Sequence, residues 1–268
     1  MRIAPALLLL LLLQAPGALA QMAVDQVYPC VVEPSVTVKV GVPVVGLLAE
    51  VMVDRGDYVV EGQVIARLND DLERATIAFN EARAATTAGV EADRARLQLA
   101  RQQLERAQEL LADDFVSEAR VDELLAEVAV GRENVRRAEN DQELARLELE
   151  RSRILLDQRT IRSPVEGIVV ERVLGEGEYV HQEAYIVEIS AIDPLHINVV
   201  LPVETFGAVA VGDQGRVKFQ QPIDVEREAR VDVVDKILDA ASGTYAVRLV
   251  LENPNGELPA GVRCTVEF

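Results

Sequence analysis

The stretch LQLARQQLERAQELLADDFVSEARVDEL, residues 97–124, decides the fold. It contains the end of one regular pattern of apolar residues and the beginning of a second one. On both sides the apolar residues recur at steps of three and four, the spacing by which a helix buries one narrow stripe against a partner helix. The rhythm stops at residues 113–116, and no Pro occurs from Asp70 to Gln158. The sequence therefore predicts two long helices folded back on each other as an antiparallel coiled-coil hairpin over residues 70–158.

The predicted seam can be written out for each arm. In the first arm it comprises Leu72, Ala75, Phe79, Ala82, Thr86, Val90, Asp93, Leu97, Ala100, Leu104, Ala107 and Leu111, with an irregular four-four step from Ala82 to Thr86 to Val90. In the second arm it comprises Val121, Leu124, Val128, Gly131, Val135, Ala138, Gln142, Ala145, Leu149, Ser152 and Leu156. At about 1.5 Å per residue each arm would be roughly 60 Å long. We therefore expect the hairpin to project and to reach a partner.

Residues 1–20 have the features of a secretory signal peptide. Arg2 precedes the apolar run Leu7–Leu13, which is too short to span a bilayer, and Ala18-Leu19-Ala20 fits a cleavage site. The sequence therefore predicts an exported chain that begins at Gln21 and is at most peripheral to a membrane. The full sequence has a formal net charge of −18, which argues against nucleic acid and anionic lipid as direct ligands.

The two cysteines, Cys30 and Cys264, lie near the two ends of the predicted mature chain. In an oxidising compartment they could form a disulfide, and they could equally be two separate buried thiols. Their spacing leaves both alternatives open.

The segments on either side of the hairpin are β-rich and resemble each other. When Gly46 is aligned with Gly167, Gly56 falls on Gly177, and Tyr58-Val59 falls on Tyr179-Val180. This internal repeat predicts two half-domains that bury their apolar faces against each other, with Val45, Val51, Val59, Val165, Ile168 and Val180 in the shared core. From Leu195 onward, short strand-like runs separated by turn residues predict a small barrel or sandwich.

This order of segments resembles the HlyD-type periplasmic adaptors, also called membrane fusion proteins. The first half carries the resemblance through Gly46–Val51, Gly56–Val59 and Gly62–Ile65, and the second through Ile161–Val169 and Gly177–Val180. The third region carries it through Tyr245–Arg248, Asn253-Pro254 and Leu258–Gly261. The chain looks most like the adaptor subunits of resistance-nodulation-division (RND) efflux systems. Because it stops at Phe268, it resembles the short form that lacks a membrane-proximal domain.

The resemblance implies a mixed α and β, elongated, modular fold. Its parts would be a split lipoyl-like domain (a barrel-sandwich hybrid), a long coiled-coil hairpin and a small C-terminal β-barrel. The expected division is a signal peptide at 1–20, a segment joining the barrel at 21–34, lipoyl-like halves at 35–69 and 159–190, the hairpin at 70–158, and the barrel at 191–268. In such a fold the chain enters and leaves through the barrel, so the segment around Cys30 is expected to pair near Cys264.

The resemblance also implies a function. Such adaptors join an inner-membrane transporter to a TolC-like outer-membrane channel in the periplasm, with several copies side by side in a ring. Those that dock on TolC-like channels carry an Arg, a Leu four residues later and a Ser seven beyond, and Arg106, Leu110 and Ser117 have this spacing. Without that role, Ser117 would be a helix N-cap, Leu110 a residue beside the seam and Arg106 a solvated charge.

The sequence argues against catalysis, cofactor attachment and metal binding. A cofactor carrier on a lipoyl-like fold needs a Lys in its second half, and Ile161–Ile189 contains none. His181 and His196 have no Cys near them in sequence, and no phosphate loop or nucleophile motif is present. We therefore predict a protein that is not an enzyme and holds no cofactor or metal. The alternatives to an RND adaptor are an adaptor of an ABC-type exporter and a structural coiled-coil protein of the cell envelope.

Overall fold

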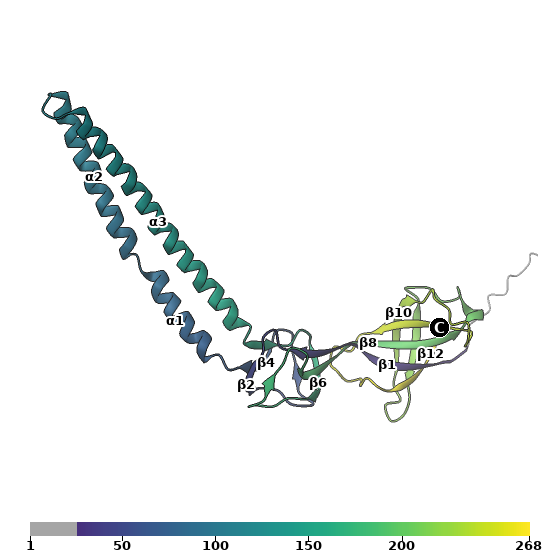
Figure 1. Ribbon diagram of the computed structural model, residues 1–268. Helices are drawn as coiled ribbons and strands as arrows, with labels where there is room; N and C mark the ends of the chain where they lie inside the picture. Colours follow the sequence, from purple (N-terminus) through teal and green to yellow (C-terminus); the bar gives the residue numbers. More distant parts are fainter. Residues whose placement is uncertain (1–25) are drawn as a thin grey trace, which may run out of the picture. The chain divides into compact units, whose positions relative to one another are not determined.

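The computed structural model describes residues 26–268, so the predicted signal peptide lies outside the described residues. The described chain forms two compact units. One is Ser35–Ile192, and in the other the residues up to Pro34 join Asp193–Phe268. The predicted combination of a split sandwich, a helical hairpin and a small barrel is confirmed (Figure 1).

The first unit contains a β-sandwich assembled from both sides of the hairpin. The strands before the hairpin are β2 (Gly46–Val51), β3 (Tyr58–Val59) and β4 (Val64–Leu68), and those after it are β5 (Thr160–Arg162), β6 (Gly167–Arg172) and β7 (Tyr179–Val180). One sheet has the order β5-β4-β2-β7. In the other, β3 pairs with β6 and β6 with β8 (Tyr185–Pro202). Strands β8 and β1 (Tyr28–Gly41) each contribute residues to both units.

The pairing of these strands follows the internal repeat. In β2 and β7, Gly46 lies opposite Val180 and Leu47 opposite Tyr179. In β6 and β3, Gly167 lies opposite Val59 and Ile168 opposite Tyr58. The β3–β6 pairing repeats the β2–β7 pairing with the roles of the two halves exchanged. The two halves are therefore related by a pseudo-two-fold axis. This confirms that they pack against each other.

The shared core differs in part from the predicted one. Val59 and Val180 are fully buried, and Val51 and Val165 pack at the edge of the core. Val45, however, precedes β2 and is exposed, so its predicted burial was wrong. Ile168 is only half-buried, because alternation along β6 turns Gly167 and Val169 inward instead. The largest fully buried side chains of this core are Leu48, Ile65, Leu68, Ile186 and Ile189.

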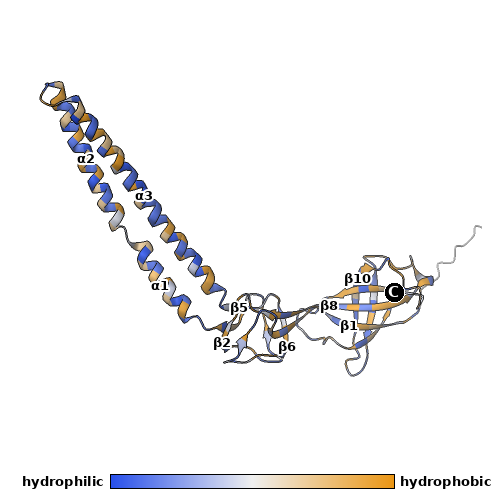
Figure 2. Ribbon diagram, viewed as in Figure 1, coloured by the Kyte–Doolittle hydropathy of each residue, from blue (hydrophilic) through white to orange (hydrophobic). Residues whose placement is uncertain are grey.

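The hairpin consists of three helices rather than two. The first arm contains α1 (Asp71–Ala85) and α2 (Ala88–Ala112), and the second is the 40-residue α3 (Glu118–Asp157), about 60 Å long at 1.5 Å per residue. Figure 2 shows hydrophilic residues dominating both arms, as expected of helices that bury only a narrow seam. Along α2 and α3 the buried residues are those of the predicted seam, Val90, Leu97, Ala107, Val121, Leu124, Val128, Ala145 and Ser152.

The seam predicted for α1 was wrong by one to two residues. Asn80 and Ala84 are buried in α1, whereas Leu72 and Phe79 are 74% and 67% exposed. The irregular step in the sequence marks the cause, because the helix is interrupted at Thr86, which is extended (φ −76°, ψ 110°). Because of this interruption, the buried residues of α1 and α2 do not follow one continuous heptad register. One register ends at Ala84, and a new one begins at Val90. Across the base of the seam, the buried Asn80 side-chain amide donates to Ser152 Oγ at 2.8 Å.

The second unit is a six-stranded β-barrel. Its remaining strands are β9 (Gln214–Phe219), β10 (Glu226–Val234), β11 (Thr244–Leu251) and β12 (Arg263–Glu267), and the short 3-10 helix η1 is Val203–Thr205. The order is β1-β12-β9-β10-β11-β8, and β8 also pairs with β1. Alternate residues of the strands fill its core, the most buried being Val32, Leu195, Ile197, Val199, Leu201, Val217, Phe219, Leu249 and Val266.

The barrel holds the two cysteines opposite each other. Strands β1 and β12 are antiparallel, with Cys30 in register with Cys264 and the Cα atoms 4.8 Å apart. The two residues form a disulfide, with both side chains buried. The bond ties together residues 234 positions apart and so fixes the first described strand to the last.

Candidate functional site: the hairpin tip

The tip of the hairpin is a short turn held by a small apolar cluster. The turn, residues 113–117, connects α2 to α3. Beneath it the buried residues are Ala107, Val121 and Leu124, with Leu104, Leu111 and Val116 packed against them. Because residues of both arms and of the turn share this cluster, the tip is a defined surface rather than a loose loop.

Arg106 and Leu110 lie on the last turns of α2. They are four residues apart, so their side chains are neighbours on one helix face. The Arg106 side chain donates from Nε to the Gln102 carbonyl at 3.1 Å, and Leu110 is 44% exposed. This face therefore offers a partner a fixed cation and an apolar side chain.

Ser117 is the N-cap residue of α3, as expected from the sequence. Its backbone is extended (φ −84°, ψ 152°), and its carbonyl accepts from the Arg120 amide at 3.0 Å. Its hydroxyl makes no capping hydrogen bond within the described chain. The hydroxyl therefore remains available at the tip, next to the start of a helix.

Phe115 is a tip residue that the sequence analysis did not select. Its side chain is 76% exposed, and its backbone amide donates to the Leu110 carbonyl at 2.9 Å. Asp114, with φ +60°, makes the sharp turn that holds Phe115 out. The sequence did contain a signal for Phe115, because it follows two aspartates in a polar turn. A solvated turn does not require an aromatic side chain at that position.

The base of the hairpin contains two ion pairs and a hydrogen bond to the residue before β2. Arg159, just after α3, pairs with Glu73 of α1 at 2.6 Å and donates to the Val45 carbonyl at 3.2 Å. Arg74 donates twice to Asp70, at 2.7 and 2.8 Å, and thereby lowers the pKa of the Asp70 carboxyl. Arg159 thus ties the bases of the two arms to each other and to the residue before β2.

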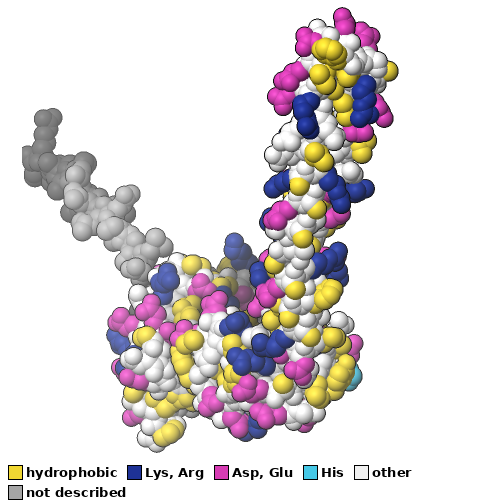
Figure 3. Space-filling model, turned by 90° about the vertical axis from the view of Figure 1, so that its left-hand side faces the viewer, with side chains coloured by type: hydrophobic (Ala, Val, Ile, Leu, Met, Phe, Trp, Pro, Cys, Tyr) yellow, Lys and Arg dark blue, Asp and Glu magenta, His cyan; other side chains and the backbone are white. Residues whose placement is uncertain are grey.

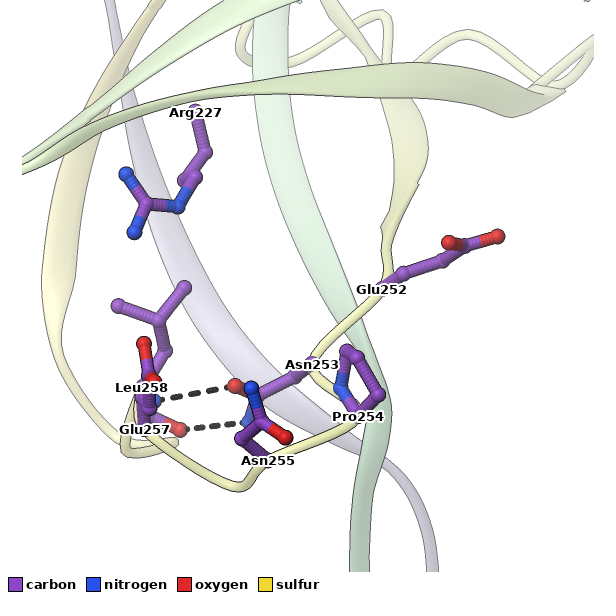
Figure 4. A pocket seen from close by; sticks show the side chains of 7 residues that line it. All are labelled: Arg227, Glu252, Asn253, Pro254, Asn255, Glu257 and Leu258. Carbon is purple, nitrogen blue, oxygen red and sulfur yellow. Dashed lines mark hydrogen bonds between the residues drawn. The ribbon is translucent and has the colours of Figure 1, made fainter.

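A pocket in the barrel has a structural explanation. It lies around the turn after β11 and is lined by Arg227, Glu252, Asn253, Pro254, Asn255, Glu257 and Leu258 (Figure 4). The Asn253 side chain donates to the Leu258 carbonyl at 2.9 Å and accepts from the Leu258 amide at 3.1 Å. Its amide is thus used to close the turn, while Glu252 points away from the other side chains of the pocket.

Neither histidine belongs to a group of metal-ligating side chains in the described part of the chain. The His181 ring packs edge-on against Tyr179, with ring centroids 5.2 Å apart, and burial lowers the pKa of His196 on β8. Within residues 26–268, no three His, Cys, Asp or Glu side chains are grouped so that they could hold a metal ion. In the same part of the chain, no helix is long and apolar enough to cross a membrane.

Comparison with known proteins gives a consistent result. Residues 36–191 match the family model of the CzcB-like barrel-sandwich hybrid domain, and residues 194–268 match that of the CusB-like β-barrel domain. The cobalt-zinc-cadmium resistance protein CzcB of Cupriavidus metallidurans is 24% identical over 222 residues, which is 83% of this chain and 40% of that protein. The chain thus matches less than half the length of this curated relative.

Solved structures share the fold. MacA from Actinobacillus actinomycetemcomitans superposes with a TM-score of 0.76 at 20% identity, covering 90% of this chain and 78% of the other. The membrane fusion protein Spr0693 from Streptococcus pneumoniae superposes with a TM-score of 0.61 at 17% identity, covering 90% of this chain and 97% of the other. The matched models, one of which spans more than half of the chain, belong to non-enzymatic adaptor proteins. The chain is therefore a member of the CzcB/CusB-like membrane fusion proteins, the periplasmic adaptors of efflux systems.

Proposed function

We propose that this chain joins an inner-membrane transporter of the RND type to a TolC-like outer-membrane channel, and that the hairpin tip docks end-on on the channel. The observation that carries the proposal is the tip itself. Leu110 and Phe115 are held exposed over a packed cluster at the end of arms about 60 Å long. Exposed apolar side chains on a rigid support are typical anchors of protein interfaces.

The tip residues have complementary roles in this docking. Leu110 and Phe115 fill grooves between helices of the channel. Arg106 donates hydrogen bonds to carbonyl or carboxylate oxygens there, since a guanidinium offers about five donors in a fixed plane. Ser117 contributes a hydroxyl at the start of α3. Several copies lie side by side, so that small contributions from each tip add through avidity.

The role is mechanical rather than chemical. The transporter supplies the energy, and the adaptors form the wall between the two membranes. The name of the curated relative suggests which cargo to test first, namely cobalt, zinc and cadmium ions. We propose divalent metal ions as the cargo of the assembly, without a binding site for them on this chain.

Metal tolerance in cells tests the docking. The variants Arg106→Asp, Leu110→Asp and Ser117→Arg should each lower tolerance to these ions towards that of cells lacking the protein, at equal protein level. The matched control is Arg132→Asp, an exposed arginine 14 residues into α3 and about 21 Å from its start. It should leave tolerance unchanged.

Cross-linking to the channel separates docking from other roles. The original chain should be captured with a TolC-like channel in the intact envelope, and the three tip variants should not. Unchanged tolerance and unchanged capture in all three tip variants would contradict the proposal. That result would favour the structural coiled-coil role, whereas copurification with an ABC-type exporter would replace the RND partner.

A further inference from the structure

The barrel is closed by a strand from the opposite end of the described chain. Five of its six strands, β8 to β12, lie together in residues 193–268, whereas the sixth, β1, contributes only the residues up to Pro34. Figure 1 shows this purple strand among the green and yellow strands of the barrel. In the strand order β1 lies between β12 and β8 and pairs with both. Removing β1 would therefore open the barrel and leave edges of β8 and β12 unpaired.

Two prolines weaken the backbone pairing of this closing strand. Pro29 and Pro34 have no amide hydrogen, so neither can donate a hydrogen bond to a neighbouring strand. The side chains that the strand buries in the barrel are Tyr28, Cys30 and Val32, at 5%, 4% and 0% exposed. The strand thus depends on these three side chains, and on the disulfide made by one of them, to stay in place.

The closing strand also has no slack where it passes from one unit to the other. Strand β1 is continuous over Tyr28–Gly41, although the boundary between the two units falls between Pro34 and Ser35. Beyond the boundary the strand is held in the other unit, where Thr37 Oγ1 lies 2.8 Å from Ser190 Oγ. A short, stiff connection between two folded parts favours exchange of the terminal part with a second copy.

We propose that the barrel part of β1 is an exchangeable strand, and that the Cys30–Cys264 disulfide is the lock that keeps it in the barrel of its own chain. Without the bond, residues 28–34 of one copy would close the barrel of a second copy. Identical strands fit identical barrels, so the same contacts form between chains as within one chain. The bond is placed to prevent this, because Cys30 on the closing strand lies in register with Cys264 on its neighbour β12.

The lock closes late, because its two sulfurs lie 234 positions apart and Cys264 belongs to the last strand. The two thiols give up two protons and two electrons to the disulfide of an oxidant, which becomes two thiols, while the Sγ–Sγ bond forms. Both cysteines are then buried in the closed barrel, where thiols in solution do not reach them. Exchange is therefore a property of the reduced chain alone.

The lock matters most where copies lie side by side, a consequence that rests on the proposed function. Neighbouring barrels would then offer their closing strands to one another at high effective concentration. Closed copies, by contrast, expose a mixed surface, since hydrophobic side chains lie among acidic and basic ones on the face seen in Figure 3. The disulfide thus keeps each copy a self-contained unit within a crowded assembly.

Two single variants test the exchange with no channel or transporter present. Cys30→Ser retains the barrel thiol Cys264, and Cys264→Ser retains the strand thiol Cys30. The two purified chains are unfolded together in urea under reducing conditions, refolded, and then treated with oxidised glutathione. Only a barrel closed by the other chain's strand brings the two thiols together. The covalent dimer from the mixture should therefore exceed that from either variant alone by at least about tenfold.

The matched control moves the strand thiol by one residue. Val31 follows Cys30 but is 43% exposed, because successive side chains of a strand point to opposite faces. A chain with Cys30→Ser, Val31→Cys and Cys264→Ser, mixed with the Cys30→Ser chain, should give less than about a tenth of the mixed dimer.

The original chain provides a second measurement that does not depend on folding of the variants. Refolded in reductant and then oxidised, it should form covalent dimers in a proportion that rises with protein concentration, whereas chain kept oxidised throughout should stay monomeric. The inference would be overturned by a mixed dimer no more abundant than in the control, or by an original chain that remains monomeric at every concentration. Either result would leave the docking proposal intact, because the test uses neither partner.

Discussion

Replacing Gly167 by Ala tests how the two halves of the sandwich fit together. A Cβ at this position would lie 2.3 Å from the Ser190 carbonyl oxygen, 2.7 Å from the Ser190 carbonyl carbon and 3.0 Å from Ala191 Cα. All three atoms belong to the backbone of β8, which cannot rotate out of the way. The repeat supplies a matched control, because Gly46 is the equivalent residue of the first half. There the added Cβ would meet Arg159 Nη1 at 2.8 Å and Leu68 Cδ1 at 3.4 Å, both ends of side chains that can move.

The expected magnitudes differ accordingly. Overpacking a core costs about 1–3 kcal/mol, and a clash with backbone belongs at the upper end, so Gly167→Ala should lower the free energy of unfolding by about 3 kcal/mol. Gly46→Ala should change it by less than about 1 kcal/mol. Alanine lowers the conformational entropy of the unfolded chain, which stabilises the protein by about 0.4–1 kcal/mol. This gain offsets a weakened hydrogen bond from Arg159 to the Val45 carbonyl, which is 3.2 Å long. Urea unfolding followed at 222 nm reports on the hairpin, which belongs to the same unit. Equal losses in the two variants, or a loss below 1 kcal/mol for Gly167→Ala, would refute the reasoning.

Two further predictions concern the cysteines and the helix break. The denatured, unreduced protein should show no reactive thiol, and reduction should lower stability by about 2–5 kcal/mol, because the bond closes a loop of 234 residues; two reactive thiols would contradict the pairing. Inserting one Ala between Thr86 and Thr87 restores the seven-residue spacing from Ala84 to Val90, so the urea midpoint should not fall and helicity should rise. The same insertion between Gln102 and Gln103 moves Leu104 and Ala107 out of the seam and should cost about 3 kcal/mol; equal damage from both insertions would contradict the phase assignment.

The internal repeat made the sandwich predictable from sequence. Gly56 and Gly177 both adopt positive φ, at 93° and 82°, so the repeated glycines mark the same turn in both halves. Val59 and Val180 are both fully buried for the same reason. The predicted burial of Val45 was wrong because alternation constrains only residues inside a strand, and Val45 lies just outside β2.

The phase of α1 could not be read from apolar spacing alone. A regular apolar stripe is formed by Leu72, Ala75, Phe79 and Ala82. In the structure this stripe is exposed. The inner stripe contains Glu73, Ile77, Asn80 and Ala84, in which two polar side chains are held by specific partners, Glu73 by Arg159 and Asn80 by Ser152. Hydrogen-bonded polar residues can occupy a seam, so a hydrophobicity pattern places the stripe wrongly where the contacts are polar.

The sequence indicates part of the partner-binding surface for a different reason. Folding of the hairpin requires small or apolar residues at a and d, and requires nothing apolar at c or g, where Leu99, Val130 and Leu144 are exposed. Charged residues would serve stability equally well there and would protect better against unwanted association, as they do at Arg94, Glu139 and Arg153, which form ion pairs beside the seam. The apolar residues that folding leaves unexplained are therefore the ones to examine for binding. Applied to the tip, the same reasoning adds Phe115 to Arg106 and Leu110, since neither the seam nor the turn needs an aromatic ring at that position.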